Sequence, residues 1–124
     1  MTAIREVMTK ELITVEPSTS VAAAVTVMGI QGVGAVLVME KGRVEGIFTE
    51  RDLVRAMSND IGASSQAVAQ WMTRNPVTVG PEASVEQALE LMLDGHFRHL
   101  PVMEGERLVG VVSIRDLSRA TLRD

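Results

Sequence analysis

The sequence predicts an α+β fold made of two pseudo-symmetric β-α-β-β-α repeats whose sheets pack face to face. Residues 3–57 align with residues 67–121 without a gap, and 20 of the 55 aligned pairs are identical. The constant offset of 64 means that every element and loop has the same length in both copies. A tandem duplication explains this, with repeats at 1–60 and 61–124. In each copy, patterns typical of strands and helices follow one another in the same order.

Each copy is predicted to open with a short helical lead-in and a short strand that ends before a proline. These four segments are residues 3–8, 11–15, 67–72 and 75–79. Trp71 is expected to anchor the second lead-in. A helix follows in each copy, because apolar residues recur at the spacing i, i+3, i+4, i+7. They are Val21, Ala24, Val25 and Met28, and then Val85, Ala88, Leu89 and Met92.

A β-hairpin and a closing helix complete each copy. The first hairpin strand is apolar nearly throughout, which is typical of a strand covered on both faces. The hairpin strands are residues 35–39 with 44–49, and 99–103 with 108–113. Ser84 and Gln87 fit a capping box at the start of the second copy's first helix. Residues 58–66 read as a polar linker between the copies.

Composition excludes several classes of function. Twelve basic and sixteen acidic residues give a net charge of −4, which argues against a nucleic-acid partner. The chain has no Cys, and therefore no disulfide and no thiolate metal site. His96 and His99 have no evident third ligand, so no metal site is expected. No signal peptide or apolar run of about 18 residues is present, so we expect a cytoplasmic protein with no membrane association.

The same seven-residue pattern, G-x-x-[ST]-x-x-D, joins the last strand to the closing helix in both copies. It reads GIFTERD from Gly46 to Asp52 and GVVSIRD from Gly110 to Asp116. A Ser or Thr followed three residues later by an acid is the signature of a helix N-cap, and this interpretation stays open. A Gly inside a strand marks the close approach of another group. The helix N-terminus favours an anion, and the carboxylate is placed to accept two hydrogen bonds from a diol such as ribose.

The chain resembles a tandem pair of CBS domains (cystathionine β-synthase domains), also called a Bateman module. The resemblance covers nearly all 124 residues. It rests on VMT and WMT, ITVEP and VTVGP, HLPV, and the G-x-x-[ST]-x-x-D pattern in both copies. It implies two clefts between the repeats that bind AMP, ADP or ATP, and in some members NAD or S-adenosylmethionine. It further implies that the Asp holds the ribose hydroxyls and that the Ser or Thr lies near the phosphate.

The resemblance also implies the residues of each cleft. The first cleft would combine Thr49, Asp52, Met72, Val77, Phe97, Arg98 and His99. The second would combine Ser113, Asp116, Met8, Ile13, Val33, Gly34 and Ala35. Arg98 and His99 supply cations for phosphate to the first cleft, and the aligned residues of the first copy are uncharged. We therefore expect the first cleft to bind phosphorylated ligands more tightly.

Three classes of function follow from these patterns. The leading hypothesis is a regulatory module that senses adenosine nucleotides, needs no cofactor, forms a homodimer and signals to an effector protein in trans. The alternative is a ligand-free structural module for dimerisation or scaffolding. An enzyme ranks last, since no nucleophile with an activating base is readable.

Overall fold

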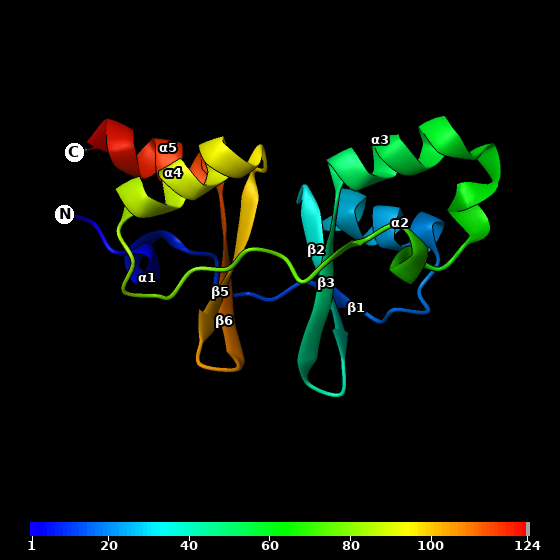
Figure 1. Cartoon of the computed structure of the whole chain (residues 1–124), viewed down its shortest axis with the longest axis horizontal. Helices are drawn as coiled ribbons and strands as arrows, with labels where there is room; N and C mark the ends of the chain where they lie inside the picture. The colour runs from blue at the N-terminus through cyan, green and yellow to red at the C-terminus, as the bar shows by residue number, and fades with distance from the viewer. Residues whose placement is uncertain (124) are drawn as a thin grey trace. The chain divides into compact units, whose positions relative to one another are not determined.

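The computed structural model describes residues 1–123 and contains two compact units that do not follow the order of the chain. Unit 1 joins Met1–Leu12 to Val77–Asp124, and unit 2 comprises Ile13–Pro76 (Figure 1). Each unit therefore contains the main body of one repeat and the lead-in of the other. The repeat boundaries at 1–60 and 61–124 concern the duplication and stay a prediction. The face-to-face packing of the two sheets also stays a prediction.

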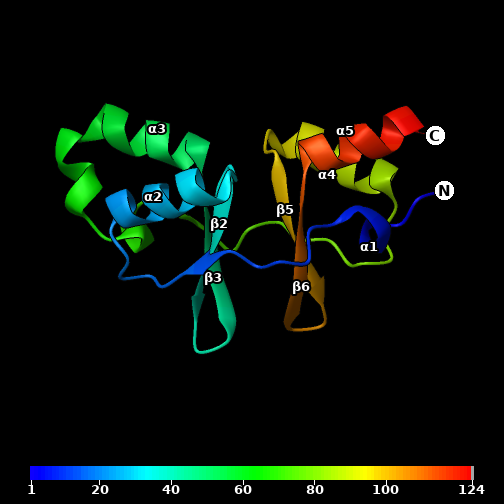
Figure 2. The ribbon, with the colours of Figure 1, turned by 180° about the vertical axis from the view of Figure 1, so that it is seen from behind.

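Unit 2 holds a four-stranded sheet in the order β1-β2-β3-β4. β1 runs parallel to β2, and the other neighbouring pairs are antiparallel. The strands are β1 (Thr14–Val15), β2 (Ala35–Glu40), β3 (Arg43–Thr49) and β4 (Thr73–Arg74). The helical segments are α2 (Val21–Gln31), α3 (Glu50–Asn59) and the 3-10 turns η1 (Ile61–Ser65) and η2 (Val68–Gln70) (Figure 2).

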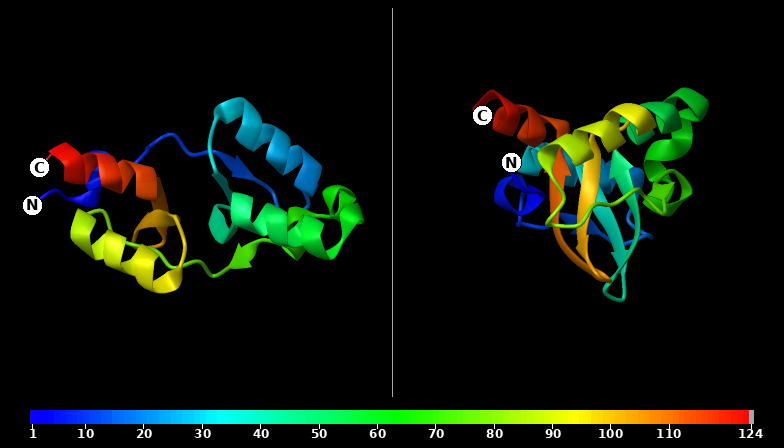
Figure 3. Two further views of the ribbon diagram at one scale, coloured as in Figure 1. Left: turned by 90° about the horizontal axis from the view of Figure 1, so that it is seen from above. Right: turned by 60° about the vertical axis from the view of Figure 1, so that its left-hand side comes forward.

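Unit 1 repeats this arrangement with shorter outer strands. Its strands β5 (His99–Glu104) and β6 (Arg107–Ser113) form an antiparallel hairpin. Single bridges from Val79 to Val102 and from Thr9 to Val111 occupy the positions that β1 and β4 have in unit 2. The helices are α1 (Ile4–Val7), α4 (Val85–Gly95) and α5 (Ile114–Arg123). α4 and α5 lie side by side (Figure 3).

The exchanged lead-ins are bound by equivalent backbone hydrogen bonds. In unit 2, the Val68 amide donates to the Thr19 carbonyl at 2.7 Å. In unit 1, the Ile4 amide donates to the Ala83 carbonyl at 2.8 Å. Val68 and Ile4 are both fully buried, one in the core of each unit. Each lead-in is therefore part of the core of the unit that receives it.

Two core clusters follow the apolar spacing that the sequence predicts. The unit 2 cluster is Val21, Ala24, Met28, Val36, Val38, Phe48, Val68 and Met72. The unit 1 cluster is Ile4, Val79, Val85, Ala88, Met92, Leu100, Val102, Val112, Leu117 and Ala120. Neighbouring residues of β2 point to opposite faces, and Val36, Leu37 and Val38 are each at most 1% exposed. The expected burial of this strand on both faces is confirmed.

The predicted capping box at α4 is also confirmed. The Gln87 amide donates to Ser84 Oγ at 3.1 Å, and the Ser84 amide donates to Gln87 Oε1 at 2.9 Å. The helix ends at His96, which takes a left-handed conformation with φ of 58°. Its counterpart at the end of α2 is Gly32, with φ of 68°. Left-handed residues of this kind commonly terminate helices.

The helical lead-ins are confirmed, as an α-helix in the first copy and a 3-10 helix in the second. Two other expectations about local structure were wrong in detail. The segment at 75–79 forms only the bridge at Val79. The expected linker at 58–66 is ordered, because α3 extends to Asn59 and η1 follows at once with Ala63 fully buried. Asp60 stabilises this turn, since its Oδ1 accepts from the Gly62 amide at 2.8 Å.

Within the described chain, none of the helices has both the length and the apolar character needed to span a bilayer.

Candidate functional site

Both copies of the G-x-x-[ST]-x-x-D pattern form the junction between a strand and a helix, and both close a capping box. The Thr49 amide donates to Asp52 Oδ2 at 2.9 Å, and the Asp52 amide donates to Thr49 Oγ1 at 3.3 Å. The Ser113 amide donates to Asp116 Oδ2 at 2.9 Å, and the Asp116 amide donates to Ser113 Oγ at 3.1 Å. The N-cap interpretation is therefore confirmed for both copies.

The glycine of each pattern lies under the exchanged lead-in. A Cβ atom built on Gly46 would lie 2.6 Å from the Thr73 carbonyl oxygen and 2.9 Å from Met72 Sδ. A Cβ atom on Gly110 would lie 2.9 Å from the Thr9 carbonyl oxygen. The close approach that a strand glycine predicts is thus confirmed, and the approaching group is the neighbouring backbone of the lead-in.

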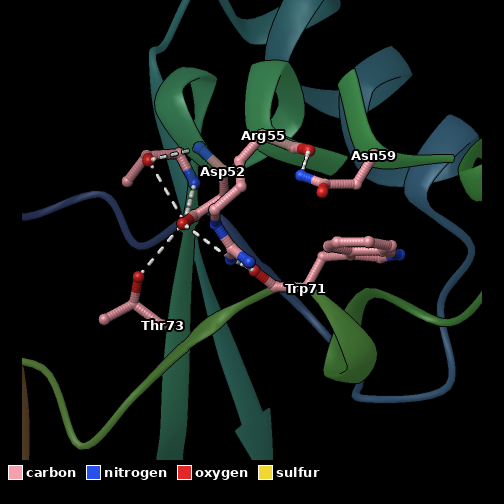
Figure 4. A network of polar contacts seen from close by, with 6 residues as sticks. Asp52, Arg55, Asn59, Trp71 and Thr73 are labelled. Atoms are coloured by element: carbon pink, nitrogen blue, oxygen red, sulfur yellow. Dashed lines mark hydrogen bonds and ion pairs between the residues drawn. The ribbon is translucent and has the colours of Figure 1, made fainter. Parts of the chain in front are cut away.

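The Asp52 carboxylate is enclosed by donors from three segments of unit 2 (Figure 4). Asp52 Oδ1 accepts from Thr73 Oγ1 at 3.1 Å and from Arg55 Nη2 at 3.4 Å. Asp52 Oδ2 accepts from Thr49 Oγ1 at 3.1 Å in addition to the Thr49 amide. The residue is only 4% exposed. The protein itself therefore supplies donors to both oxygens of this buried charge.

Arg55 is held by a second set of contacts. Its Nη2 also donates to the carbonyl oxygen of Trp71, and its guanidinium carbon lies 5.6 Å from the centre of the indole ring. That separation is within the range of a cation–π interaction. Trp71 Nε1 donates to Gln66 Oε1 at 2.8 Å, and Gln66 Nε2 donates to Asp60 Oδ2 at 2.7 Å. Trp71 thus anchors the second lead-in, as expected, and also fixes Arg55 against Asp52 (Figure 4).

The Asp116 carboxylate accepts fewer hydrogen bonds than that of Asp52. Its Oδ2 accepts from the Ser113 amide, and no donor from the described part of unit 1 contacts Oδ1. The residue is half-buried, whereas Asp52 is buried. Asp116 therefore retains acceptor capacity at a helix N-terminus, where backbone amides favour an anionic group.

Two segments of the chain match the same known domain. A model of the CBS domain matches residues 4–59 and again residues 68–123. The chain belongs to the CBS-domain family.

This CBS-domain chain is similar to proteins of comparable length. It is 39% identical to the uncharacterized 17.7 kDa protein in bps2 3'region of Acidianus ambivalens, over 98% of this chain and 74% of that protein. The crystal structure of the CBS-domain containing protein ATU1752 from Agrobacterium tumefaciens is 38% identical, with a TM-score of 0.92 over 97% of this chain and 99% of that one. The crystal structure of CBSX2 in complex with AMP is 27% identical, with a TM-score of 0.84 over 98% and 96% of the two chains.

Several of the expected site residues of this CBS pair lie near Thr49 within unit 2. Ala35 pairs with Thr49 across the β2–β3 hairpin, and the Glu50 amide donates to the Gly34 carbonyl at 3.1 Å. Met72 is a core residue that is 7% exposed. The other two, Ile13 and Val33, are partly buried against the same core.

The remaining expected residues lie in unit 1. His99 pairs with Ser113 across the β5–β6 hairpin, and the Ile114 amide donates to the Arg98 carbonyl at 2.8 Å. Arg98 is exposed and His99 is half-buried. The side chains that pack against the core of unit 1 include Met8 and Phe97, while Val77 is 46% exposed. The backbone of the two cationic residues is therefore adjacent to the Ser113–Asp116 junction.

Each expected cleft combines residues of unit 1 with residues of unit 2, and the composition of both clefts stays a prediction. Within single units, the structure adds two residues that the sequence patterns did not assign to a site, namely Arg55 and Thr73. Arg55 is three residues after Asp52 on a helix, a spacing at which side chains meet. Thr73 belongs to the WMT segment, whose strand pairing with Gly46 and Ile47 brings it beside Asp52.

Proposed function

We propose that this CBS-domain chain is a regulatory module that binds an adenosine nucleotide and signals to an effector protein in trans. The observation that carries the proposal is the Asp116 carboxylate, which has one oxygen without a donor from the described part of unit 1. It lies at the N-terminus of α5, a ten-residue helix. The similar structure of CBSX2 in complex with AMP supports an adenosine ligand of this kind.

The chemistry of this junction fits a ribose linked to a phosphate. Adjacent ribose hydroxyls donate two hydrogen bonds, and a carboxylate accepts them. The amides of Ile114 and Asp116 in the first turn of α5 already donate to the Arg98 carbonyl and to Ser113 Oγ, so the helix favours a phosphate through its dipole.

The proposed ligand classes are AMP, ADP and ATP, with NAD and S-adenosylmethionine sharing the same adenosine group. The proposed contact residues near Asp52 are Thr49, Met72, Val77, Phe97, Arg98 and His99. Those near Asp116 are Ser113, Met8, Ile13, Val33, Gly34 and Ala35. The proposal assigns no catalytic role and no required cofactor.

The proposal includes a homodimer. Apolar side chains remain exposed on the helical segments of each unit, which favours association with another copy. The most exposed are Ile30, Val54, Ile61, Leu93 and Leu122, at 65% or more. Light scattering at tens of micromolar should report twice the mass of the chain, and a monomer would contradict this part of the proposal.

A ligand-free scaffold is the second candidate function. The complete capping boxes at Thr49 and Ser113 favour it, because helix capping alone accounts for the Thr, Ser and Asp of both patterns. Under this alternative no adenosine compound binds, and the motif only starts α3 and α5.

Thermal denaturation with each of the five ligands separates the two functions. A ligand that binds only the folded state adds about 2.7 kcal/mol at one hundred times its dissociation constant. We expect AMP at millimolar concentration to raise the melting temperature by several degrees. The double variant Asp52→Ala/Asp116→Ala should lose this rise.

The control is Gln87→Ala, which removes an equivalent capping contact in α4 outside both motifs. It should lower the melting temperature without ligand and keep the full rise with AMP. If none of the five ligands changes the melting temperature of the native chain, the scaffold function is the correct one.

A further inference from the structure

The carboxylates of Asp52 and Asp116 differ in the number of hydrogen bonds that they accept. A carboxylate accepts hydrogen bonds at about four positions. Asp52 uses four, from the Thr49 amide, the Thr49 hydroxyl, the Thr73 hydroxyl and Arg55. Among the described residues of its own unit, Asp116 accepts from the Ser113 amide alone. A ribose diol at Asp52 must therefore displace existing donors, and a diol at Asp116 has an oxygen available.

The residue types do not explain why Asp52 accepts more hydrogen bonds, because both copies contain the arginine and the threonine. Arg119 is the equivalent of Arg55 at the offset of 64, and Thr9 is the equivalent of Thr73. No hydrogen bond or ion pair joins Arg119 or Thr9 to Asp116 in the described chain. A neighbouring residue that contacts Arg55 and has no counterpart in the other copy would account for the difference.

Trp71 is that neighbour. Its carbonyl and its ring both contact Arg55, and its indole nitrogen is fixed by Gln66. The residue equivalent to Trp71 is Val7, which offers no aromatic face to Arg119. Arg55 is thus fixed between Trp71 and Asp52 in unit 2 (Figure 4), and Val7 supplies no ring for the equivalent contact in unit 1.

We propose that Arg55, held by Trp71, is an internal competitor for ribose at Asp52, so that an adenosine nucleotide occupies the Asp116 motif first. Thr73 assists by donating its hydroxyl to Asp52 Oδ1, the oxygen that Arg55 also contacts. This inference rests on the proposed function and assigns an order of occupancy to its two motifs. It reverses the order expected from the cationic residues alone.

The binding test is calorimetric titration with adenosine and with AMP. Asp116→Ala should weaken the tighter binding of both compounds at least tenfold, and Asp52→Ala should leave it unchanged. Adding Arg55→Ala to Asp116→Ala should restore binding at the Asp52 motif by a similar factor. The matched control adds Arg119→Ala to Asp116→Ala and should restore nothing, because Arg119 lies on α5 in the unit of the Asp116 motif.

Arg55→Gln is the second variant, in case Arg55→Ala does not fold. Gln is a good helix former without a charge, so it removes the ion pair and preserves the helix. It should restore binding in the Asp116→Ala background to the same extent as Arg55→Ala. Circular dichroism of each variant confirms the fold before titration.

Trp71 gives a readout that needs no ligand, because the chain contains a single Trp. Arg55→Ala and Arg55→Gln should shift its fluorescence emission, and Arg119→Ala should not. In the native chain, AMP at concentrations that fill only the tighter site should leave the emission unchanged. In the Arg55→Ala/Asp116→Ala variant, AMP should alter it.

The outcomes separate the inference from the function on which it rests. If native protein binds AMP but Asp52→Ala abolishes the tighter site, the inference is wrong and the proposed function stands. If neither arginine variant restores binding to Asp116→Ala, the inference is likewise overturned. If no adenosine compound binds native protein or any variant, the proposed function fails and the inference fails with it.

Discussion

At the scale of the residue, Gly46 and Gly110 are the positions at which each unit receives the lead-in of the other repeat. Each lies in a strand with the carbonyl oxygen of an antiparallel neighbour less than 3 Å from where a Cβ would be. The approaching residues are Thr73 in unit 2 and Thr9 in unit 1. A side chain at either glycine would move a backbone, which costs more than moving a flexible side chain. The motif glycine is therefore required for packing, whatever binds at the Asp.

Gly46→Ala should reduce the free energy of unfolding by about 1–3 kcal/mol, as overpacking of a close contact does. Urea denaturation followed by circular dichroism measures this loss. Gly29→Ala is the control, because Gly29 lies within α2 and, apart from its chain neighbours and the backbone of its own helix, no heavy atom lies within 4 Å of the position that a Cβ would take. It should raise the free energy of unfolding by about 0.5–1 kcal/mol. Equal effects at the two sites would contradict the close-contact explanation.

At the scale of the element, α1 is fixed to unit 1 by charge as well as by its buried Ile4. Arg5 lies 2.7 Å from Glu82 and 3.0 Å from Glu104, and Arg107 lies 3.3 Å from Glu104. The hydrogen bond from Arg5, followed by that from Arg107, lowers the pKa of Glu104 below its ordinary value of 4.5. The hydrogen bonds to Glu82 and Glu104 raise the pKa of Arg5. The cluster is exposed, so salt screens it.

The sign of the Glu104 pKa shift fixes a pH dependence. A carboxyl whose pKa is lower when folded stabilises the fold above its unfolded pKa, and this contribution is lost as pH falls through the folded pKa. Glu104→Gln should therefore lower the melting temperature at pH 7 and have a smaller effect below about pH 4. The effect at pH 7 should shrink in about 1 M salt.

Glu40→Gln is the matched control, since Glu40 occupies the equivalent position in unit 2 and forms no ion pair among residues 1–123. Its melting temperature should differ little from that of the native chain at either pH. A loss for Glu104→Gln that is the same at pH 7 and pH 4 would exclude the ion-pair explanation.

At the scale of the whole molecule, each compact unit depends on a segment from the other repeat. Residues 1–12 belong with residues 77–124, and the lead-in around Val68 belongs with residues 13–76. A perturbation of one lead-in should therefore appear in the other repeat. The stability of each repeat thus depends on a lead-in that the other repeat supplies.

Ile4→Ala should reduce the free energy of unfolding by about 2–5 kcal/mol, since Ile4 is fully buried in the core of unit 1. Hydrogen exchange should show the larger loss of protection in β5 and β6, although Ile4 precedes the first repeat's own strands. Val68→Ala is the matched control, and it should reduce the hydrogen-exchange protection of β2 and β3 more than that of β5 and β6. Loss of protection confined to β2 and β3 in Ile4→Ala would contradict the exchange of lead-ins.

The sequence alone determined the duplication, the order of elements in each copy and most of the core. Apolar residues at helical spacing, such as Val85, Ala88 and Met92, are core residues, because a period of 3.6 directs them to one face. The capping pair Ser84 and Gln87 depends only on neighbours within one turn. These features were predictable since the interactions that decide them are local or repeated in both copies.

Only the tertiary structure decided the exchange of lead-ins and the contrast between Asp52 and Asp116. The Gly, hydroxyl and Asp positions of the motif are shared by the two copies, so pattern alone makes the carboxylates equivalent. Arg55 contacts both Asp52 and Trp71, and Trp71 is 16 residues further along the chain. Trp71 lies beside Arg55 because η2 precedes it and β4, which follows it, pairs with β3. Contacts between segments distant in sequence depend on strand pairing, which no local periodicity encodes, and for this reason the difference became visible only in the folded chain.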